Sequence, residues 1–186
     1  MDTDRPAEAD ELERLRAAAV DGDTAALERL LTAVEPLVTR RCARMLPCRQ
    51  DAEEAAQDAM LAITENLDGY RGTGSFPGWV STIAANSAWS TYRRLKQRSE
   101  AAAETVPERP DPRTTSVIAG SRLDLLEALD ELERDHPEQA RSFVLRDLAA
   151  LSYAEIAARE EAPLGTVQAR IHRARRFLQP RLTTTD

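Results

Sequence analysis

The sequence predicts an all-α protein in which two small helical domains are joined by a flexible linker. Charged residues make up 31% of its 186 residues and aromatic residues only 4%, a composition that favours helices over the β-branched and aromatic runs of a β-sandwich. Apolar residues recur at helical spacing on both sides of residues 99–120, whereas that stretch holds three prolines and no sustained periodicity. The expected organisation is an acidic tail and first helix start over residues 1–20, a domain over 21–98, the linker 99–120 and a second domain over 121–183.

The first domain is predicted to contain three helices. Asp21-Gly22-Asp23 is a helix-start signal, and leucines and valines follow it at helical spacing as far as Met45. Pro36 lies inside this pattern and predicts a kink or a break. A second helix is expected to begin at the capping-box-like run Asp51-Ala52-Glu53-Glu54, and Pro77 suits the first turn of a third.

A glycine-rich loop over residues 68–75 is expected between the second and third helices. Five of the eight aromatic residues lie from Tyr70 to Tyr92, beside Arg93 and Arg94. Aromatic rings interleaved with arginines suit unstacked single-stranded bases, because stacking contributes about 1–3 kcal/mol per base. Core packing is the alternative interpretation; it is favoured for the two tryptophans, whereas Tyr70 in the loop is expected to be exposed.

The second domain is predicted to end in a helix-turn-helix. A helix from about Ser121 is broken at Asp135-His136-Pro137, which begins the next helix. Ser152-Tyr153-Ala154-Glu155 then forms a capping box for a short helix, which Pro163-Leu164-Gly165 terminates. The final helix carries an apolar stripe of residues spaced by four, three and four: Val167, Ile171, Ala174 and Leu178. A short helix, a tight turn and a basic helix make a helix-turn-helix.

The other face of this final helix is polar and basic. Opposite the stripe lie Ala169, His172, Arg173 and Arg176, flanked by Gln168, Arg170 and Arg175. Forked donors and a small side chain suit the major groove, where arginine pairs with guanine and glutamine with adenine. The backbone amides of the first turn, from Leu164 to Thr166, suit a phosphate. A basic amphipathic helix that only keeps the chain in solution is the alternative.

The charge is unevenly distributed. A formal net charge of −7 argues against nucleic acid as a partner only if the charge is evenly spread. The arginines instead gather over residues 40–49, 93–98 and 170–181, while residues 122–161 hold most of the acids of the second domain. Two of these basic clusters close predicted helices, so they favour surfaces that meet DNA.

Several classes of protein and site are not expected. No apolar stretch approaches the roughly 20 residues of a membrane span, and the acidic start does not resemble a signal peptide, so we expect a cytoplasmic protein without membrane insertion. Cys42 and Cys48 have no partners at metal-ligand or disulfide spacing, and we expect buried, reduced thiols and no metal or cofactor. His172 likewise has no ligand partner at metal spacing. No phosphate loop or nucleophile–base pair indicates an enzyme.

Two sets of motifs carry a family resemblance. The first set comprises Asp51-Ala52-Glu53-Glu54, Gln57-Asp58, Tyr70-Arg71-Gly72, Phe76, Trp79, Ile83-Ala84 and Asn86. The second comprises Leu151-Ser152-Tyr153-Ala154-Glu155-Ile156-Ala157, Pro163-Leu164-Gly165-Thr166-Val167, Arg170 and His172-Arg173-Ala174. In this order, on either side of a linker, they resemble regions 2 and 4 of the bacterial RNA polymerase sigma factors of the extracytoplasmic-function (ECF) type.

The resemblance implies a promoter-specificity subunit that is not itself an enzyme. It implies docking on the beta-prime clamp of core RNA polymerase through Glu54, Gln57, Asp58 and Leu61, and contact of region 4 with the beta flap. Recognition of the −10 element is implied for Tyr70, Arg71, Gly72, Asn86, Arg93 and Arg94. Recognition of the −35 element is implied for Thr166, Gln168, Ala169, Arg170, His172, Arg173 and Arg176. An anti-sigma protein is the expected further partner, and the free chain is expected to be a monomer.

Three departures from the family pattern bear on the −35 and −10 elements. Glu160-Glu161-Ala162 precedes Pro163 where a turn glycine is usual, which is expected to place two acids close to DNA. Gln168-Ala169 replaces a more common basic-plus-serine pair, and Ala85 replaces a frequent basic residue. Two other functions therefore stay open: a stand-alone helix-turn-helix regulator, and a sigma-like adapter or decoy that binds polymerase or an anti-sigma protein but no promoter.

Overall fold

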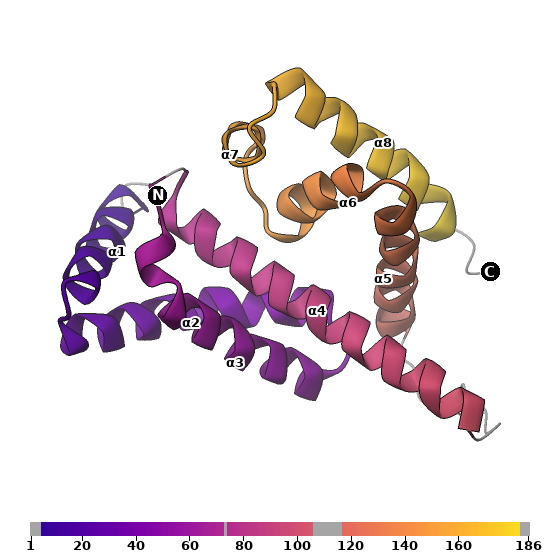
Figure 1. The fold of residues 1–186 in the computed structure, drawn as a ribbon, viewed down its shortest axis with the longest axis horizontal. Helices are drawn as coiled ribbons and strands as arrows, with labels where there is room; N and C mark the ends of the chain where they lie inside the picture. Colours follow the sequence, from indigo (N-terminus) through magenta and orange to yellow (C-terminus); the bar gives the residue numbers. More distant parts are fainter. Residues whose placement is uncertain (1–4, 73, 106–116, 183–186) are drawn as a thin grey trace.

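All regular secondary structure among the described residues is helical. The computed structural model describes residues 5–72, 74–105 and 117–182, with side chains from residue 10 to 101, except 73, and from 122 to 182. Helices α1–α4 form one group and α5–α8 a second, as Figure 1 shows. The predicted all-α class with two helical groups is confirmed.

The first group packs α2, α3 and α4 along one another, with α1 against one end (Figure 1). Its elements are α1 (Arg5–Val20), α2 (Thr24–Met45), α3 (Arg49–Glu65), the short 3₁₀ turn η1 (Leu67–Gly69) and α4 (Phe76–Thr105). Its core pairs branched side chains with small ones; it includes Leu30, Val34, Val38, Ala55, Ala59, Ile63, Val80, Ala84 and Ala88. Alanines at these contacts let the helix axes approach closely, because the interaxial distance follows side-chain size.

Two details of these helices differ from the sequence-based expectations. Helix α2 continues through Pro36 without a break; Pro36 and Thr32, whose carbonyl loses its helical hydrogen bond, both lie on the exposed face, where water can solvate that carbonyl. Helix α3 begins at Arg49, ahead of Asp51, and its N-cap Cys48 makes no side-chain cap bond, so the predicted capping box there is wrong.

The second group consists of α5 (Val117–Asp135), α6 (Pro137–Phe143) with a π-helical turn η3 (Val144–Leu148), α7 (Tyr153–Arg159) and α8 (Leu164–Leu182). The predicted stripe of α8 is buried in full: Val167, Ile171, Ala174 and Leu178. The capping box of α7 is also confirmed, with Ser152 accepting from the amide of Glu155 and the Glu155 carboxylate accepting from the amide of Ser152.

The segment between the groups is shorter than the predicted linker. Helix α4 continues past Arg98 to Thr105 and α5 begins at Val117, so both ends of residues 99–120 are helical. Residues 106–116 of the predicted linker, with its three prolines, lie outside the described residues.

Glu161 adopts a left-handed backbone conformation with φ of 49° in the turn between α7 and α8. This conformation costs a residue with a side chain roughly 1–2 kcal/mol, part of which a glycine regains. We expect Glu161→Gly to raise the free energy of unfolding by about 0.5–1 kcal/mol in urea titrations. Glu161→Ala is the matched control, because it removes the same carboxylate and keeps the strain; equal stability of the two variants would contradict the explanation.

Candidate nucleic-acid interface

The loop before α4 is shaped by an aromatic cluster. Tyr70 packs edge-on against Phe76, with ring centroids 5.3 Å apart, and its hydroxyl donates to the carbonyl of Gly74 at 2.7 Å. Gly72 and Gly74 have φ of 72° and 89°, which residues with side chains rarely adopt. Tyr70 is half-buried rather than fully exposed, and this burial, followed by the nearby Glu13 carboxylate, raises its pKa.

A groove of about 440 Å³ runs along the outer side of α4. It is lined by Asn86, Trp89, Ser90, Arg93, Arg94 and Gln97, and Asn86 and Arg93 lie on one face because they are seven residues apart. Asn86 and Arg93 are exposed, as are Arg71 and Gly72 in the preceding loop. The structure therefore brings Asn86, Arg93 and Arg94 together, while Arg71 and Gly72 lie before the start of the helix.

The two arginines of this groove form ion pairs in the structure. Arg94 pairs with Glu54 of α3 at 2.7 Å and lies 3.8 Å from Asp58. Arg93 pairs with Glu133 of α5 at 3.4 Å. In this conformation, α3 and α5 therefore supply acidic partners to the groove.

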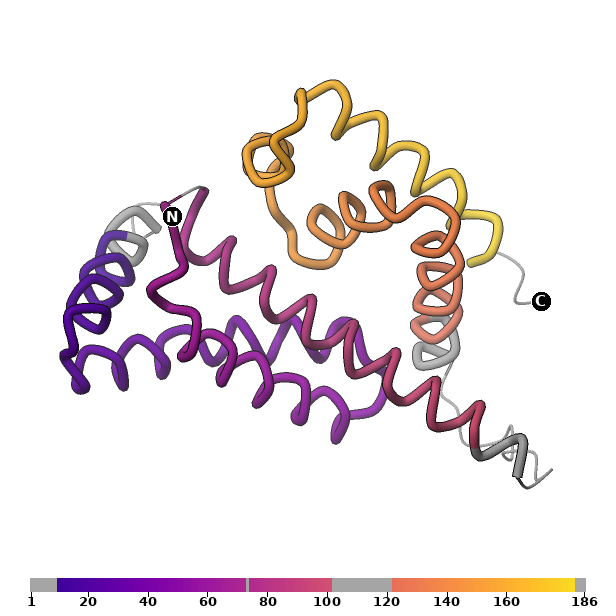
Figure 2. Tube along the Cα trace, in the orientation of Figure 1, coloured from indigo at the N-terminus to yellow at the C-terminus, as the bar shows by residue number. Residues whose placement is uncertain are grey.

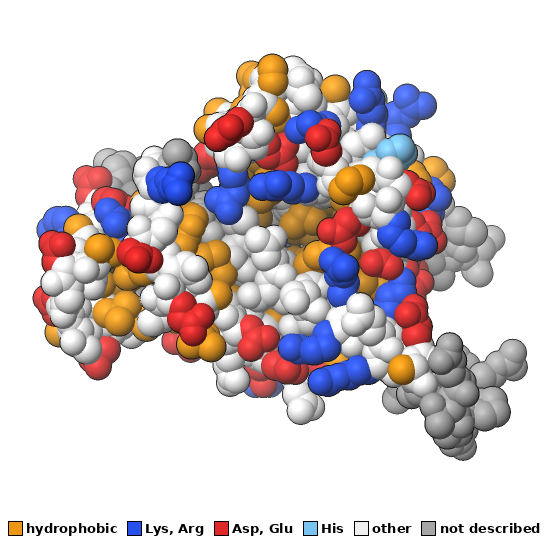
Figure 3. Space-filling view, in the orientation of Figure 1, with side chains coloured by type: hydrophobic (Ala, Val, Ile, Leu, Met, Phe, Trp, Pro, Cys, Tyr) orange, Lys and Arg blue, Asp and Glu red, His pale blue; other side chains and the backbone are white. Residues whose placement is uncertain are grey.

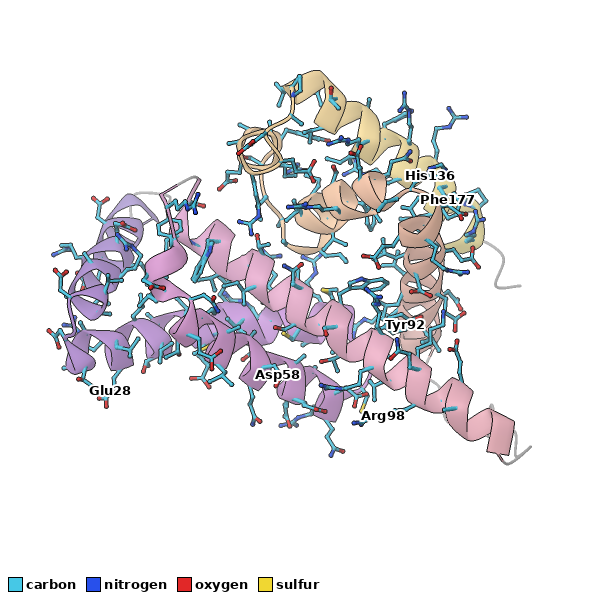
Figure 4. The ribbon with its side chains drawn as sticks, in the orientation of Figure 1. Glu28, Asp58, Tyr92, Arg98, His136 and Phe177 are labelled. Atoms are coloured by element: carbon cyan, nitrogen blue, oxygen red, sulfur yellow. The ribbon has the colours of Figure 1, made fainter. Side chains whose placement is uncertain are left out.

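The residues implied in polymerase docking lie on one exposed face of α3. Glu54, Gln57, Asp58 and Leu61 all point away from the alanine stripe that packs on α2 and α4, and Leu61 is 58% exposed. Figure 4 labels Asp58 on this outer side of the group. A shallow groove of about 590 Å³ lies alongside, lined by Gln57 and Met60 of α3 and by Leu31 and Glu35 of α2.

The helix-turn-helix is formed by α7 and α8. Thr166, Gln168, His172, Arg173 and Arg176 are exposed on α8 opposite its buried stripe, and Ala169 is half-buried. Among the described side chains, Arg173 and Arg176 form no ion pair, so their guanidinium groups can donate to phosphates or to base edges. Lys and Arg side chains gather over α8 and over the second half of α4 in the space-filling view (Figure 3).

Arg170 and Glu160 have an arrangement that differs from the sequence-based expectation for Glu160. The Glu160 side chain is only 4% exposed; it accepts from Arg170 at 3.1 Å and from the hydroxyl of Ser142 at 2.8 Å. Arg170 also pairs with Glu138. Of the two acids expected near DNA, only Glu161 is exposed, because Glu160 turns inward to pair with α8.

Sequence reasoning missed Ser75 and its contact with Glu155, which it had assigned only to the capping box of α7. Ser75 and Glu155 join the loop before α4 to the first turn of α7, with their hydroxyl and carboxylate oxygens 2.6 Å apart. Ser75 also accepts from the amide of Gly78 at 3.2 Å, so the Ser-x-x-Gly spacing was a cap signal that could have drawn attention to it.

The two cysteines differ in their exposure to solvent. Cys42 is buried, which raises its pKa to about 11, whereas Cys48 is exposed, contrary to expectation, because it precedes α3 at the surface. In the part of the chain that the structure describes, no group of three metal-ligating side chains occurs. Within the same residues, no helix is long and apolar enough to cross a membrane.

Family comparisons match both helical groups. Residues 30–98 match sigma-70 region 2, and residues 122–178 match sigma-70 region 4. The chain is 35% identical over 166 residues to the ECF RNA polymerase sigma factor SigE of Mycolicibacterium smegmatis, covering 85% of this chain and 63% of that protein. This chain thus spans less than two thirds of the length of that relative.

Other relatives are similar over most of their own length. The ECF RNA polymerase sigma-E factor of Escherichia coli K12 is 28% identical, with 83% of this chain and 85% of that protein covered. The RNA polymerase sigma-H factor of Pseudomonas aeruginosa is 29% identical, with 87% and 90% covered. The solved structure of CnrH in complex with the cytosolic domain of CnrY has the same fold, with a TM-score of 0.56 at 23% identity over 96% of this chain and 99% of that one. The chain belongs to the ECF group of the sigma-70 family, whose members direct RNA polymerase to promoters and are not enzymes.

Proposed function

We propose that this chain binds core RNA polymerase and selects promoters through two separate surfaces. The groove on α4 with Asn86 takes the single-stranded −10 element, and the exposed face of α8 reads the −35 element as duplex. The observation that carries the proposal is the presence, on one chain, of a polar groove that includes the ring of Trp89 and of a helix-turn-helix whose exposed Arg173 and Arg176 form no ion pair with another described residue.

The individual roles follow from the chemistry of each surface. Tyr70, Arg71 and Gly72 border the −10 site, and Arg93 and Arg94 hold the nearby DNA backbone once their acidic partners move away. Base readout in the major groove falls to Gln168, His172, Arg173 and Arg176. Ala169 lies between them, and Thr166 lies near a phosphate at the helix start. Arg170 reaches DNA only by leaving Glu160 and Glu138.

The partners and compartment follow from the same proposal. Glu54, Gln57, Asp58 and Leu61 form the docking face for the beta-prime clamp, and region 4 contacts the beta flap. The protein acts in the cytoplasm, where polymerase and promoter meet, as a monomer when free. An anti-sigma protein holds it in reserve; the solved CnrH structure, which contains the cytosolic domain of CnrY, supports such a partner.

Asn86→Ala is expected to impair promoter opening more than duplex binding. The Asn86 side chain is exposed in the α4 groove and carries donors and acceptors for an unstacked base, while the −35 surface lies on another helix. We expect about a tenfold loss of run-off transcription with core polymerase, because a lost polar base contact costs about 1–3 kcal/mol. A template whose −10 element is already unpaired should not rescue transcription by the variant, because the contact with the base is still missing.

Glu28→Ala is the control for this variant, since Glu28 is exposed on α2 at the far end of the first group (Figure 4). Its transcription should equal that of the unaltered protein. If the unaltered protein forms no stable complex with core polymerase yet binds duplex DNA, the chain is instead a stand-alone helix-turn-helix regulator. If it binds polymerase but initiates at no promoter, it is an adapter or decoy.

A further inference from the structure

Helix α1 packs against the loop that the proposed function places at the −10 element. Figure 2 shows α1 beside the chain that leads from η1 into α4, and α1 contacts both of these elements. The inward face of α1 carries Leu12, Leu15, Arg16 and Ala19, which are spaced by three, one and three residues. An arginine therefore occupies a position on the buried stripe of an amphipathic helix, where an apolar side chain is usual.

Arg16 is held in a defined position on this inward face. Its Nε and Nη2 atoms donate to one carboxylate oxygen of Glu13 at 3.0 and 2.6 Å. The Arg16 side chain is 19% exposed, whereas that of Arg14, two residues earlier, is 73% exposed. Arg29 of α2 pairs with Glu11 at 2.9 Å, which also joins α1 to α2. Arg16 is thus largely covered by protein, unlike a cation that only keeps a surface in water.

The guanidinium group of Arg16 lies over the ring of Tyr70, with its central carbon 5.3 Å from the ring centroid. A cation within about 6 Å of an aromatic face is attracted by the quadrupole of the ring. Phe76 and Trp79 contact the same ring from α4, with centroids 5.3 and 5.8 Å from that of Tyr70. Tyr70 is therefore held by two residues of α4 and by one residue of α1.

The position of Tyr70 determines the path of the loop. Its hydroxyl donates to the carbonyl of Gly74 at 2.7 Å, which closes the loop on itself. Gly72 and Gly74 have positive φ, so this backbone has freedom that residues with side chains would not allow. Arg71 and Gly72 are exposed and directly follow Tyr70 in the chain. A shift of the Tyr70 ring therefore moves the backbone that presents Arg71 and Gly72 to DNA.

We propose that Arg16 is a positioning residue for the −10 element, which holds the Tyr70 ring, and through it the loop, in the conformation that selects bases. This inference rests on the proposed function, because that function assigns the loop to the −10 element. Arg16 acts through Tyr70, since two of its nitrogens bind Glu13 and its guanidinium group lies over the ring. The match to sigma-70 region 2 begins at residue 30, so α1 lies outside the residues that it covers.

The test measures base selection at the −10 element by the holoenzyme. Arg16→Met removes the cation and keeps an unbranched apolar side chain on the inward face. Arg14→Met is the matched control, because it makes the same exchange at an exposed position of the same helix. The probes are a promoter that the unaltered holoenzyme uses and copies of it with one base of the −10 element replaced at a time. Selectivity is the ratio of run-off product from the original promoter to that from each copy.

Arg16→Met should lower this ratio about two- to fivefold at one or more positions of the −10 element, the factor that corresponds to one exposed cation–π contact. Arg14→Met should leave every ratio unchanged. Equal ratios for Arg16→Met and Arg14→Met would overturn the proposal.

Stability and a conservative variant separate positioning from a merely structural role. Methionine suits a buried stripe, so Arg16→Met should keep the urea midpoint of the unaltered protein. Arg16→Lys keeps a cation that can lie over the ring and should recover part of the selectivity. A loss in Arg16→Lys as large as that in Arg16→Met would contradict the proposal, because a cation over the ring would then make no difference.

Substitutions of Tyr70 test whether Arg16 acts through the ring. In a Tyr70→Phe background, which keeps the ring, Arg16→Met should lower the selectivity by the same factor as in the unaltered protein. In a Tyr70→Leu background, which removes the ring, Arg16→Met should lower it no further, because the effects of two residues that act through one contact are not additive. An equal further loss in both backgrounds would mean that Arg16 acts without Tyr70.

Initiation by the unaltered holoenzyme separates this inference from the proposed function. If it initiates and discriminates among −10 bases while Arg16→Met behaves like Arg14→Met, Arg16 is not a positioning residue and the promoter function stands. If it initiates at no promoter, the promoter function is wrong and the role of Arg16 falls with it.

Discussion

Replacing Glu160 with glutamine is expected to lower the free energy of unfolding of the second helical group by about 2–3 kcal/mol. Breaking a fully buried ion pair costs about 3–5 kcal/mol. The expected loss is smaller here because Glu138 still pairs with Arg170. The Glu160 side chain is 4% exposed and Arg170 only 19%, so little water replaces the lost charge. Glutamine keeps the shape and can still accept from Ser142, which isolates the effect of charge. Urea titrations should give a lower midpoint at an unchanged slope.

Glu161→Gln is the matched control, since the neighbouring carboxylate is exposed and its loss should change stability by less than about 0.5 kcal/mol. The Glu160→Gln substitution also frees Arg170 from its buried partner. The affinity of this variant for duplex DNA should therefore rise while its stability falls. Equal stability of the two glutamine variants would mean that the Arg170 pair contributes nothing, and that Arg170 is already available to a phosphate.

The helix-turn-helix could be predicted because local signals agree there. The stripe of Val167, Ile171, Ala174 and Leu178 has the helical period, and Ser152 and Glu155 form a capping box within four residues of chain. Both are properties of short segments, which do not depend on how the rest of the chain packs. The same reasoning correctly placed His172, Arg173 and Arg176 on the exposed face of α8, whereas Ala169, expected beside them, is half-buried.

The contacts between the groups could not be predicted in this way. Ser75 and Glu155 are far apart in the sequence, and the partner of a carboxylate across a tertiary contact leaves no local signal. Glu160 shows the same limit: as the C-cap of α7 it can face outward or inward, and only the packing of α6 and α8 places Ser142 and Arg170 beside it. An acid near a recognition helix is therefore not necessarily an acid near DNA.

The extent of α4 was underestimated for a different reason. The prediction ended the helix near Arg98 because no apolar stripe continues beyond it. Alanine and glutamate make up most of the residues that follow, and they are strong helix formers whether or not one face is buried. Periodicity detects only helices that pack, so an exposed extension has no periodic signal.

Ile171→Ala and His172→Ala are expected to have opposite effects, although the residues are adjacent. Ile171 is 1% exposed in the stripe that holds α8 on the second group, so its truncation should cost about 2–5 kcal/mol of stability. His172 is exposed on the outer face, so its loss should change stability by less than about 0.5 kcal/mol. Thermal unfolding of the two variants measures this difference directly.

Transcription should reverse the order once the temperature is low enough for both variants to stay folded. A base contact by His172 is worth about 1–3 kcal/mol, so His172→Ala should lose about tenfold or more of the activity that depends on the −35 element. Ile171→Ala should then keep most of this activity, because its neighbours on the outer face are unchanged. If His172→Ala keeps full activity on a −35-dependent promoter, base readout lies with Gln168, Arg173 and Arg176, and His172 only borders the interface.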